Sequence, residues 1–156
     1  MRHQRVDGSW PYAVGDRRDW ADNFHTAYVL DALETYSTLT EDDEVRPAIR
    51  RGWDFYRSHF FHDGRVPKYY SNALLPVDAT ACAQSLVTLC RFGDVETAAR
   101  VAEWTVDHLQ CDDGHIAYQQ RRRRVVRIPY MRWSSAYMYF GLSRLAHALA
   151  GHQGPP

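Results

Sequence analysis

The stretch Asp63-Gly64-Arg65-Val66-Pro67-Lys68-Tyr69-Tyr70 lies between two helix-like runs in the middle of a 156-residue chain. It has two counterparts, in residues 4–12 and 110–118, and each contains Asp-Gly with an aromatic residue a few positions later. The Asp-Gly pairs begin at positions 7, 63 and 113, so they lie 56 and 50 residues apart. A recurrence at about 50 residues predicts a repeated supersecondary unit.

Asp-Gly pairs have a local reason to recur. The Asp side chain bonds its own backbone and Gly accepts positive φ, so the pair makes a tight turn. One such pair is weak evidence for a repeat. Three of them, each followed by a tyrosine and two of them preceded by Gln three residues earlier, are more specific.

Composition predicts one globular domain over residues 1–152, with 153–156 as a tail. The hydrophobic content is 45%, and Lys+Arg equals Asp+Glu at 19 each. This hydrophobic content favours a packed core. The balanced charge gives no indication that nucleic acid or an acidic membrane is a partner. The polar N-terminus shows no signal peptide, and no run is apolar enough to span a bilayer. We therefore expect a cytoplasmic protein, with Cys82 and Cys90 as buried thiols of a helix.

Hydrophobic periodicity predicts five helices, over residues 23–37, 44–60, 78–92, 94–110 and 133–150. Asp22, Asp78 and Asp94 are suitable N-caps, and Gly93 is suited to end the third helix. The first, third and fifth helices are apolar on most of their circumference, whereas the second and fourth are amphipathic. This alternation predicts a more buried inner set and a more exposed outer set, joined by long loops at one end. The fold class is thus all-α, a partial α/α toroid of about five helices with a small β-hairpin near residues 115–130.

Several stretches resemble known toroid families. Residues 4–10 resemble the Gln-x-x-Asp-Gly-x-Trp turn of prenyltransferase and terpene-cyclase repeats. The layout is similar to the (α/α)6 toroids of six-hairpin glycosidases, polysaccharide lyases and uronyl epimerases. Residues 19–26, 67–70, 76–78 and 129–133 resemble a toroid group of bacterial surface-polysaccharide biosynthesis. The resemblance implies a carbohydrate setting rather than a particular mechanism.

The chain departs from that class in helix number, since a full toroid has six hairpins and about twelve helices. Three explanations stay open: a fragment of a longer protein, two copies that complete a ring, or an open arc. A repeat array without caps exposes apolar faces, so we expect self-association.

The long loops lead into the N-termini of the first, third and fifth helices, whose free amides favour anionic groups. If equivalent loops lie on one side, their polar and aromatic residues line one mouth. We expect His25, Asp78 and Tyr70 as catalytic residues. The expected substrate-binding residues are Tyr12, Asp22, Asn23, Lys68, Tyr69, Tyr118, Tyr130, Arg132 and Trp133.

Each of these residues also has a structural interpretation. Asp22 and Asp78 suit N-caps, His25 could bond a loop carbonyl, and tyrosines commonly pack. Residues 121–124 are four arginines, of which alternate ones could face the mouth or simply protect a sheet edge. No spacing indicates a metal site, and no cofactor is expected.

Two functions of different class follow. The first is a carbohydrate-active protein of hydrolase, lyase or epimerase type that acts on or binds an acidic polysaccharide. The second is a non-catalytic glycan-binding or scaffold module of polysaccharide assembly, and the lack of a clear acid/base pair leaves open whether the chain is an enzyme. A terpenoid-cyclase-like activity ranks third, because residues 76–81 keep only part of the Asp-x-Asp-Asp-Thr-Ala acid motif.

Overall fold

The computed structural model describes residues 2–15 and 17–152; the expected tail at 153–156 lies outside them. Within these residues the chain is predominantly helical, which confirms the all-α prediction and the five helices. A 3₁₀ turn, Asp43–Val45, precedes the second helix, and a π-helical segment, Met131–Ala136, precedes the fifth. The helices are α1 (Asn23–Thr40), α2 (Arg46–Phe60), α3 (Ala79–Arg91), α4 (Val95–Leu109) and α5 (Tyr137–His152).

Local chemistry sets most helix boundaries. The carboxylates of Asp22, Asp78 and Asp94 accept hydrogen bonds from the first-turn amides of α1, α3 and α4, as their N-cap positions predict. Gly93 follows α3 with a φ of +78°, a conformation that glycine adopts without steric cost. The fifth helix differs from its predicted start at 133, because a wider π-helical turn occupies residues 131–136.

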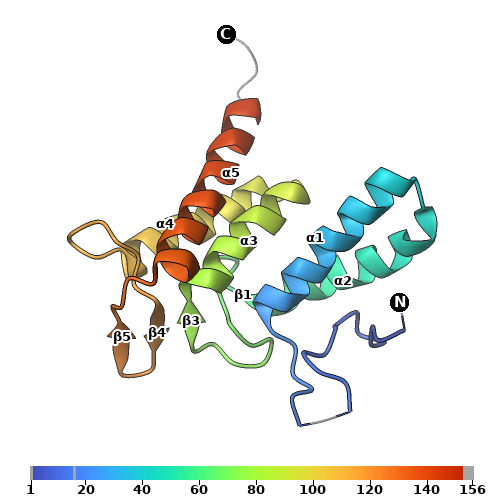
Figure 1. The fold of residues 1–156 in the computed structure, drawn as a ribbon, viewed down its shortest axis with the longest axis horizontal. Coiled ribbons are helices and arrows are strands. Elements are labelled where there is room, and N and C mark those ends of the chain that lie inside the picture. Colours follow the sequence, from blue (N-terminus) through green and yellow to red (C-terminus); the bar gives the residue numbers. More distant parts are fainter. Residues whose placement is uncertain (1, 16, 153–156) are drawn as a thin grey trace.

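The helices form two rows. α1, α3 and α5 lie side by side, with α3 in the middle; α2 packs on α1, and α4 packs on α3 (Figure 1). We call α1, α3 and α5 the inner helices and α2 and α4 the outer helices. The core lies between the two rows and includes Leu30, Tyr56, Phe60, Leu86 and Leu89.

The expectation that all three inner helices are more buried than the outer two is wrong for α1 and α5. Ten of the thirteen residues of α3 are buried, but α1 buries five of its eighteen. Large apolar side chains on the two end helices remain exposed, including Tyr28, Leu39, Tyr139 and Phe140. The reason is positional, since α3 has an inner neighbour on both sides whereas α1 and α5 have one each.

The three long loops lie on the same side of the helices, as predicted, and appear below them in Figure 1. Backbone hydrogen bonds connect them in sequence. The Asn23 amide donates to the Tyr69 carbonyl over 2.9 Å, and the Ala79 amide donates to the Tyr118 carbonyl over 2.9 Å. The first loop is thereby fixed to the second, and the second to the third.

Short antiparallel strands organise the second and third loops. β1 (Phe61–His62) pairs with β2 (Val66–Pro67) around the Asp63-Gly64 turn. β3 (Val77–Asp78) pairs with β4 (Gln119–Arg121), which pairs in turn with β5 (Arg124–Val126). The predicted hairpin near residues 115–130 is therefore present, and β3 joins it to the N-terminus of α3.

The first and third Asp-Gly turns, which we call turn 1 (residues 4–9) and turn 3 (residues 110–115), have the same hydrogen bonds. In turn 1 the Gly8 amide donates to Arg5 O, the Arg5 amide to Ser9 O, and Gln4 Nε2 to Gly8 O. Turn 3 repeats all three bonds with residues 106 positions later. Turn 2 (residues 61–65) differs, because both Asp63 and Gly64 have positive φ within a hairpin.

The cysteines are free. Cys82 is buried as expected, but Cys90 is only half-buried, so the expectation of a buried thiol is wrong there; Cys111 is half-buried as well. Burial raises the pKa of the Cys82 thiol, so this group behaves as a small apolar side chain. Within residues 2–15 and 17–152, no helix combines the length and apolar character that crossing a bilayer requires.

Candidate functional site

A cavity of about 460 Å³ opens where the N-termini of α1 and α3 meet the π-helical segment. Its walls are mainly aromatic. They comprise Phe24, Tyr28, Tyr69, Tyr118, Trp133 and Tyr137. Four polar residues complete the lining, namely His25, Asp78, Thr80 and Arg132. Apolar walls with a few convergent polar groups are typical of small-molecule sites.

His25 and Asp22 form a carboxylate–imidazole pair at one edge of this cavity. His25 Nδ1 lies 2.9 Å from Asp22 Oδ1 and 3.0 Å from Oδ2, and the same carboxylate caps α1. Asp22 is buried, whereas the His25 side chain is 53% exposed. Since Nδ1 is engaged by the carboxylate, Nε2 is the ring nitrogen available to a ligand.

Among the described residues, Asp78 is the single carboxylate that lines the cavity. Its Oδ1 accepts a hydrogen bond of 2.7 Å from the Ala81 amide at the start of α3, and the side chain is buried. Burial raises the pKa of Asp78 to about 6; the nearby Asp22 carboxylate adds to this rise, although backbone amide donors act against it. A carboxyl group with such a pKa is partly protonated near neutrality and is suited to give or take a proton.

Tyr69 lies close to both acids. Burial raises its pKa, and the charges of Asp22 and Asp78 raise it further, so the phenol stays protonated. Tyr118 and Tyr137 also have pKa values raised mainly by burial. These phenols are hydrogen-bond donors at the cavity wall rather than bases.

The π-helical segment forms the rim. The Thr80 hydroxyl donates to the Trp133 carbonyl over 2.8 Å, which fixes this segment to the first turn of α3. Tyr130 lies edge-on to Tyr118, with ring centroids 5.0 Å apart. Arg132 and Trp133 are exposed beside the opening. π-helical turns occur frequently at functional sites.

A second cavity, of about 500 Å³, adjoins the first. The two share Tyr69 and Tyr118, and the second is also lined by Tyr70, Arg121 and Arg122. The four arginines at 121–124 are all exposed, and the first two of them border this cavity. Together the two cavities make a longer cleft that is divided by two tyrosines; we call it the aromatic cleft.

The structure brings most of the predicted site residues to this cleft. His25, Asp78, Tyr69, Tyr118, Arg132 and Trp133 line the first cavity, Asp22 supports His25, and Tyr130 packs on Tyr118. Tyr70 lines the second cavity instead of the first. Tyr12 lies just outside, edge-on to the His25 ring with centroids 4.8 Å apart.

Two predicted residues lie elsewhere. Asn23 is fully buried between the helix rows, where its Oδ1 accepts hydrogen bonds from Tyr56 and Ser85. Lys68 Nζ donates to the Ser71 carbonyl over 2.6 Å and thereby holds the second loop. Neither side chain lines the aromatic cleft.

Four residues that line the first cavity were absent from the predicted site: Phe24, Tyr28, Thr80 and Tyr137. The sequence contained a signal for two of them. Phe24 and Tyr28 are four residues apart and flank His25, so they extend its helix face. The prediction that the first helix belongs to a more buried inner set places these two side chains in the core instead.

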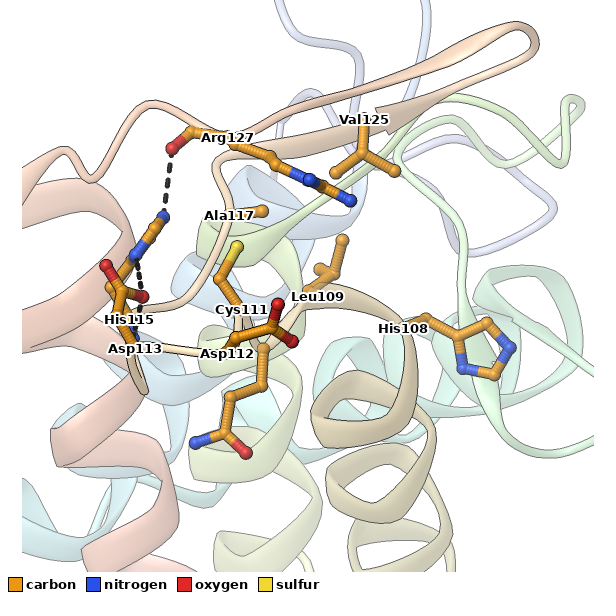
Figure 2. Close-up of a pocket in the computed structure, with 10 residues that line it drawn as sticks. His108, Leu109, Cys111, Asp112, Asp113, His115, Ala117, Val125 and Arg127 are labelled. Carbon is orange, nitrogen blue, oxygen red and sulfur yellow. Dashed lines mark hydrogen bonds and ion pairs between the residues drawn. The ribbon is translucent and has the colours of Figure 1, made fainter.

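A separate cavity of about 380 Å³ lies beside turn 3. Figure 2 shows the His115 ring between the Asp113 carboxylate and the Arg127 carbonyl, with Cys111 on the adjacent segment. His115 Nδ1 bonds Asp113, and Nε2 donates to Arg127 O over 2.9 Å. The His115 backbone amide, and then the His115 ring, hydrogen-bond the Asp113 carboxylate and lower its pKa. The bond to the Arg127 carbonyl ties turn 3 to the segment after β5. Within the described part of the chain, no three His, Cys, Asp or Glu residues are placed to hold a metal ion.

Comparison with known proteins assigns no family. No protein-family model matches the chain, and no curated protein matches it significantly.

Proposed function

We propose that the aromatic cleft binds an acidic oligosaccharide and acts on it by acid–base chemistry. The observation that supports this proposal is the meeting of aromatic walls, the His25–Asp22 pair and Asp78 in one cavity. The setting that goes with the proposal is polysaccharide metabolism in the cytoplasm.

The walls suit sugar rings. Aromatic faces bury the apolar C–H face of a pyranose, and phenol hydroxyls at their edges bond its hydroxyl groups. Tyr69 and Tyr118 belong to both cavities, so an oligosaccharide could place neighbouring rings on either side of them.

The charges favour an acidic sugar. Arg132 lines one cavity, and Arg121 and Arg122 line the other. Guanidinium groups bind carboxylates in a bidentate way, which suits a uronate. The N-termini of α1 and α3 add partial positive charge at the floor.

The arrangement of acids distinguishes between reactions. Glycoside hydrolysis generally needs two carboxylates across the bond, and Asp78 is the only one lining the cavity among the described residues. Proton abstraction beside a uronate carboxylate needs a base and an acid. In β-elimination, His25 Nε2 would take the C5 proton, the C4–O4 bond would break, and Asp78 would protonate the leaving oxygen. Lyase or epimerase chemistry therefore fits better than hydrolysis.

One observation favours binding without catalysis. The Asp78 carboxylate already caps α3 and is 3% exposed, so its access to a substrate oxygen is restricted. A glycan-binding or scaffold module is the second candidate.

The test measures binding and turnover separately. Isothermal titration with uronate-containing and neutral oligosaccharides should show binding of the acidic ones alone, weakened by added salt. Arg132→Ala should weaken binding about tenfold. Arg50→Ala, an exposed change on outer helix α2, is the matched control and should have no effect. Equal affinity for both sugars, or equal effects of the two variants, contradicts the proposal.

Turnover distinguishes the two candidates. If the cleft is catalytic, an unsaturated uronate product should appear by its ultraviolet absorbance, and His25→Gln should remove it while retaining binding. Binding with neither an unsaturated product nor exchange of the C5 proton for solvent deuterium, for wild type and variant alike, assigns the protein to the non-catalytic class.

A further inference from the structure

Turns 1 and 3 share their internal hydrogen bonds but not their surroundings. Turn 1 lies against outer helix α2, and Gln4 forms the contact. Gln4 Nε2 donates to the Ala48 carbonyl over 2.8 Å, and Arg51 Nη2 donates to Gln4 Oε1 over 2.9 Å. A Cβ atom on Gly8 would lie 2.2 Å from the Arg51 carbonyl oxygen, so the turn and the helix are in close contact.

Turn 2 also lies against an outer helix. Arg100 of α4 donates through Nε to the Gly64 carbonyl over 3.1 Å. Arg51 and Arg100 are each the sixth residue of their helix, counted from Arg46 and Val95. The same helix position therefore supplies an arginine to the Asp-Gly turn in both units.

α2 and α4 match in a second way. Phe55 stacks on His59 at 4.2 Å, and Trp104 stacks on His108 at 4.5 Å. Each pair occupies the tenth and fourteenth positions of its helix. The two outer helices are thus equivalent elements of a repeat: an Asp-Gly turn, an inner helix, and an outer helix that covers the turn.

Turn 3 has the inner helix, α5, but no outer helix among the described residues. Gln110 Nε2 donates to Gly114 O within the turn over 3.4 Å, and the side chain makes no other hydrogen bond within residues 2–15 and 17–152; Gln110 is exposed. A Cβ atom on Gly114 would meet nothing within 4 Å. The surface that α2 covers on turn 1 is open on turn 3.

The helix that follows turn 3 also presents an open apolar face. Tyr139 is 76% exposed and Leu149 41%, and Ala146 and Ala150 are exposed on the same helix. α5 contains no Asp or Glu. An exposed apolar surface of this kind commonly marks a contact with another protein.

We propose that turn 3 and the exposed face of α5 bind a basic, amphipathic helix of the α2 type that is not among the described residues. The occupant's backbone carbonyl accepts from Gln110 Nε2, as Ala48 O does from Gln4. An arginine of the occupant donates to Gln110 Oε1, as Arg51 does to Gln4, and the exposed Asp112 and Asp113 favour a basic helix.

A second copy of this chain is a poorer occupant. In each copy α2 already covers turn 1 and α4 already covers turn 2, so neither outer helix is available for a third turn. The missing element must therefore come from a different helix.

The experiment uses a labelled peptide with the sequence of residues 43–61, which includes α2, and the full chain. Fluorescence anisotropy should show saturable one-to-one binding. Gln110→Ala in the protein should weaken it about tenfold, and so should Arg51→Ala in the peptide. Combining both changes should weaken binding no further than Gln110→Ala alone, because that variant already removes the arginine contact.

Two controls distinguish this contact from non-specific binding of the peptide. Arg123→Ala, at the exposed tip of the β4–β5 hairpin, should leave binding unchanged, and a scrambled peptide should not bind. Circular dichroism checks that Gln110→Ala is folded. Absence of saturable binding, or equal affinity for wild type and Gln110→Ala, overturns the proposal. So does a dimer in analytical ultracentrifugation that the peptide leaves intact, because a second copy would then cover the face.

Discussion

Gly8 and Gly114 have the same place in two identically bonded turns, with φ values of +92° and +87°, yet only Gly8 lies against a helix. Alanine at either position incurs the left-handed backbone strain, about 1–2 kcal/mol. At Gly8 it also collides with the Arg51 carbonyl. We therefore expect Gly8→Ala to lower the free energy of unfolding, measured in urea, by about 3 kcal/mol or more, and Gly114→Ala to lower it by about 1 kcal/mol. Equal costs would show that the two turns have equal surroundings.

The buried hydroxyl of Tyr56 gives a second prediction. It donates to Asn23 Oδ1 over 2.9 Å and lies 3.1 Å from Ser85 Oγ, which joins α1, α2 and α3. Tyr56→Phe should lower the free energy of unfolding by about 1–2 kcal/mol, since a buried acceptor loses a donor. Tyr36→Phe is the matched control, because its hydroxyl bonds Asp42 at the surface, and it should change stability by less than about 0.5 kcal/mol.

Asp78 predicts a pH-dependent stability. Its folded pKa of about 6 lies above the 3.8 of an exposed Asp, so the folded state holds the proton more tightly. The resulting stabilisation is present below about pH 4 and is lost as the pH rises through 6. Asp78→Asn cannot titrate but can still cap α3. Its stability relative to wild type should therefore rise by about 2–3 kcal/mol between pH 4 and pH 8.

Asp78→Ala provides the control for that measurement. It removes the cap and the charge together, so it should lie about 1 kcal/mol below Asp78→Asn at every pH. If the difference in free energy of unfolding between Asp78→Asn and wild type stays constant from pH 4 to pH 8, the raised pKa of Asp78 is contradicted.

The close approach of α5 to α3 depends on the absence of a side chain at Gly141. A Cβ atom there would lie 2.8 Å from the Ala83 carbonyl oxygen and 3.2 Å from Ala83 Cα. Gly141→Ala should push the helices apart and cost about 1–3 kcal/mol. Gly151→Ala, on the same helix in open space, should be neutral or stabilising by up to about 1 kcal/mol. Thermal unfolding of both variants tests the pair.

The sequence was informative where structure depends on neighbouring residues. Asp22 and Asp78 were recognisable as N-caps because the capping bond spans three residues, and helix N-termini that meet at one end bring their caps together. The repeat of Asp-Gly turns predicted that three distant loops lie on one side. Those relationships position the floor of the aromatic cleft.

The sequence was less informative where the position of a side chain depends on its direction around the helix axis or on packing against distant segments. Asn23 and His25 are two residues apart, so about 200° of helix rotation separates them; Asn23 enters the core and His25 the cleft. Lys68 is next to Tyr69 in the sequence, but its ammonium group donates a hydrogen bond to a carbonyl of its own loop. The exposure of α1 and α5 depends on which neighbours are present, which periodicity alone does not determine.

The π-helical segment makes the rim of the cleft sensitive to chain length. The Ser135 amide bonds the Tyr130 carbonyl, five residues back, so this turn holds one residue more than an α-helical turn. Deleting a single residue between 131 and 136 would let an ordinary α-helix form without losing any side chain of α5. It would also rotate Arg132 and Trp133 by about 100° relative to Tyr137, which remains packed against α3. Residue count in this turn, as much as residue identity, thus decides whether the rim and the wall of the cleft face each other.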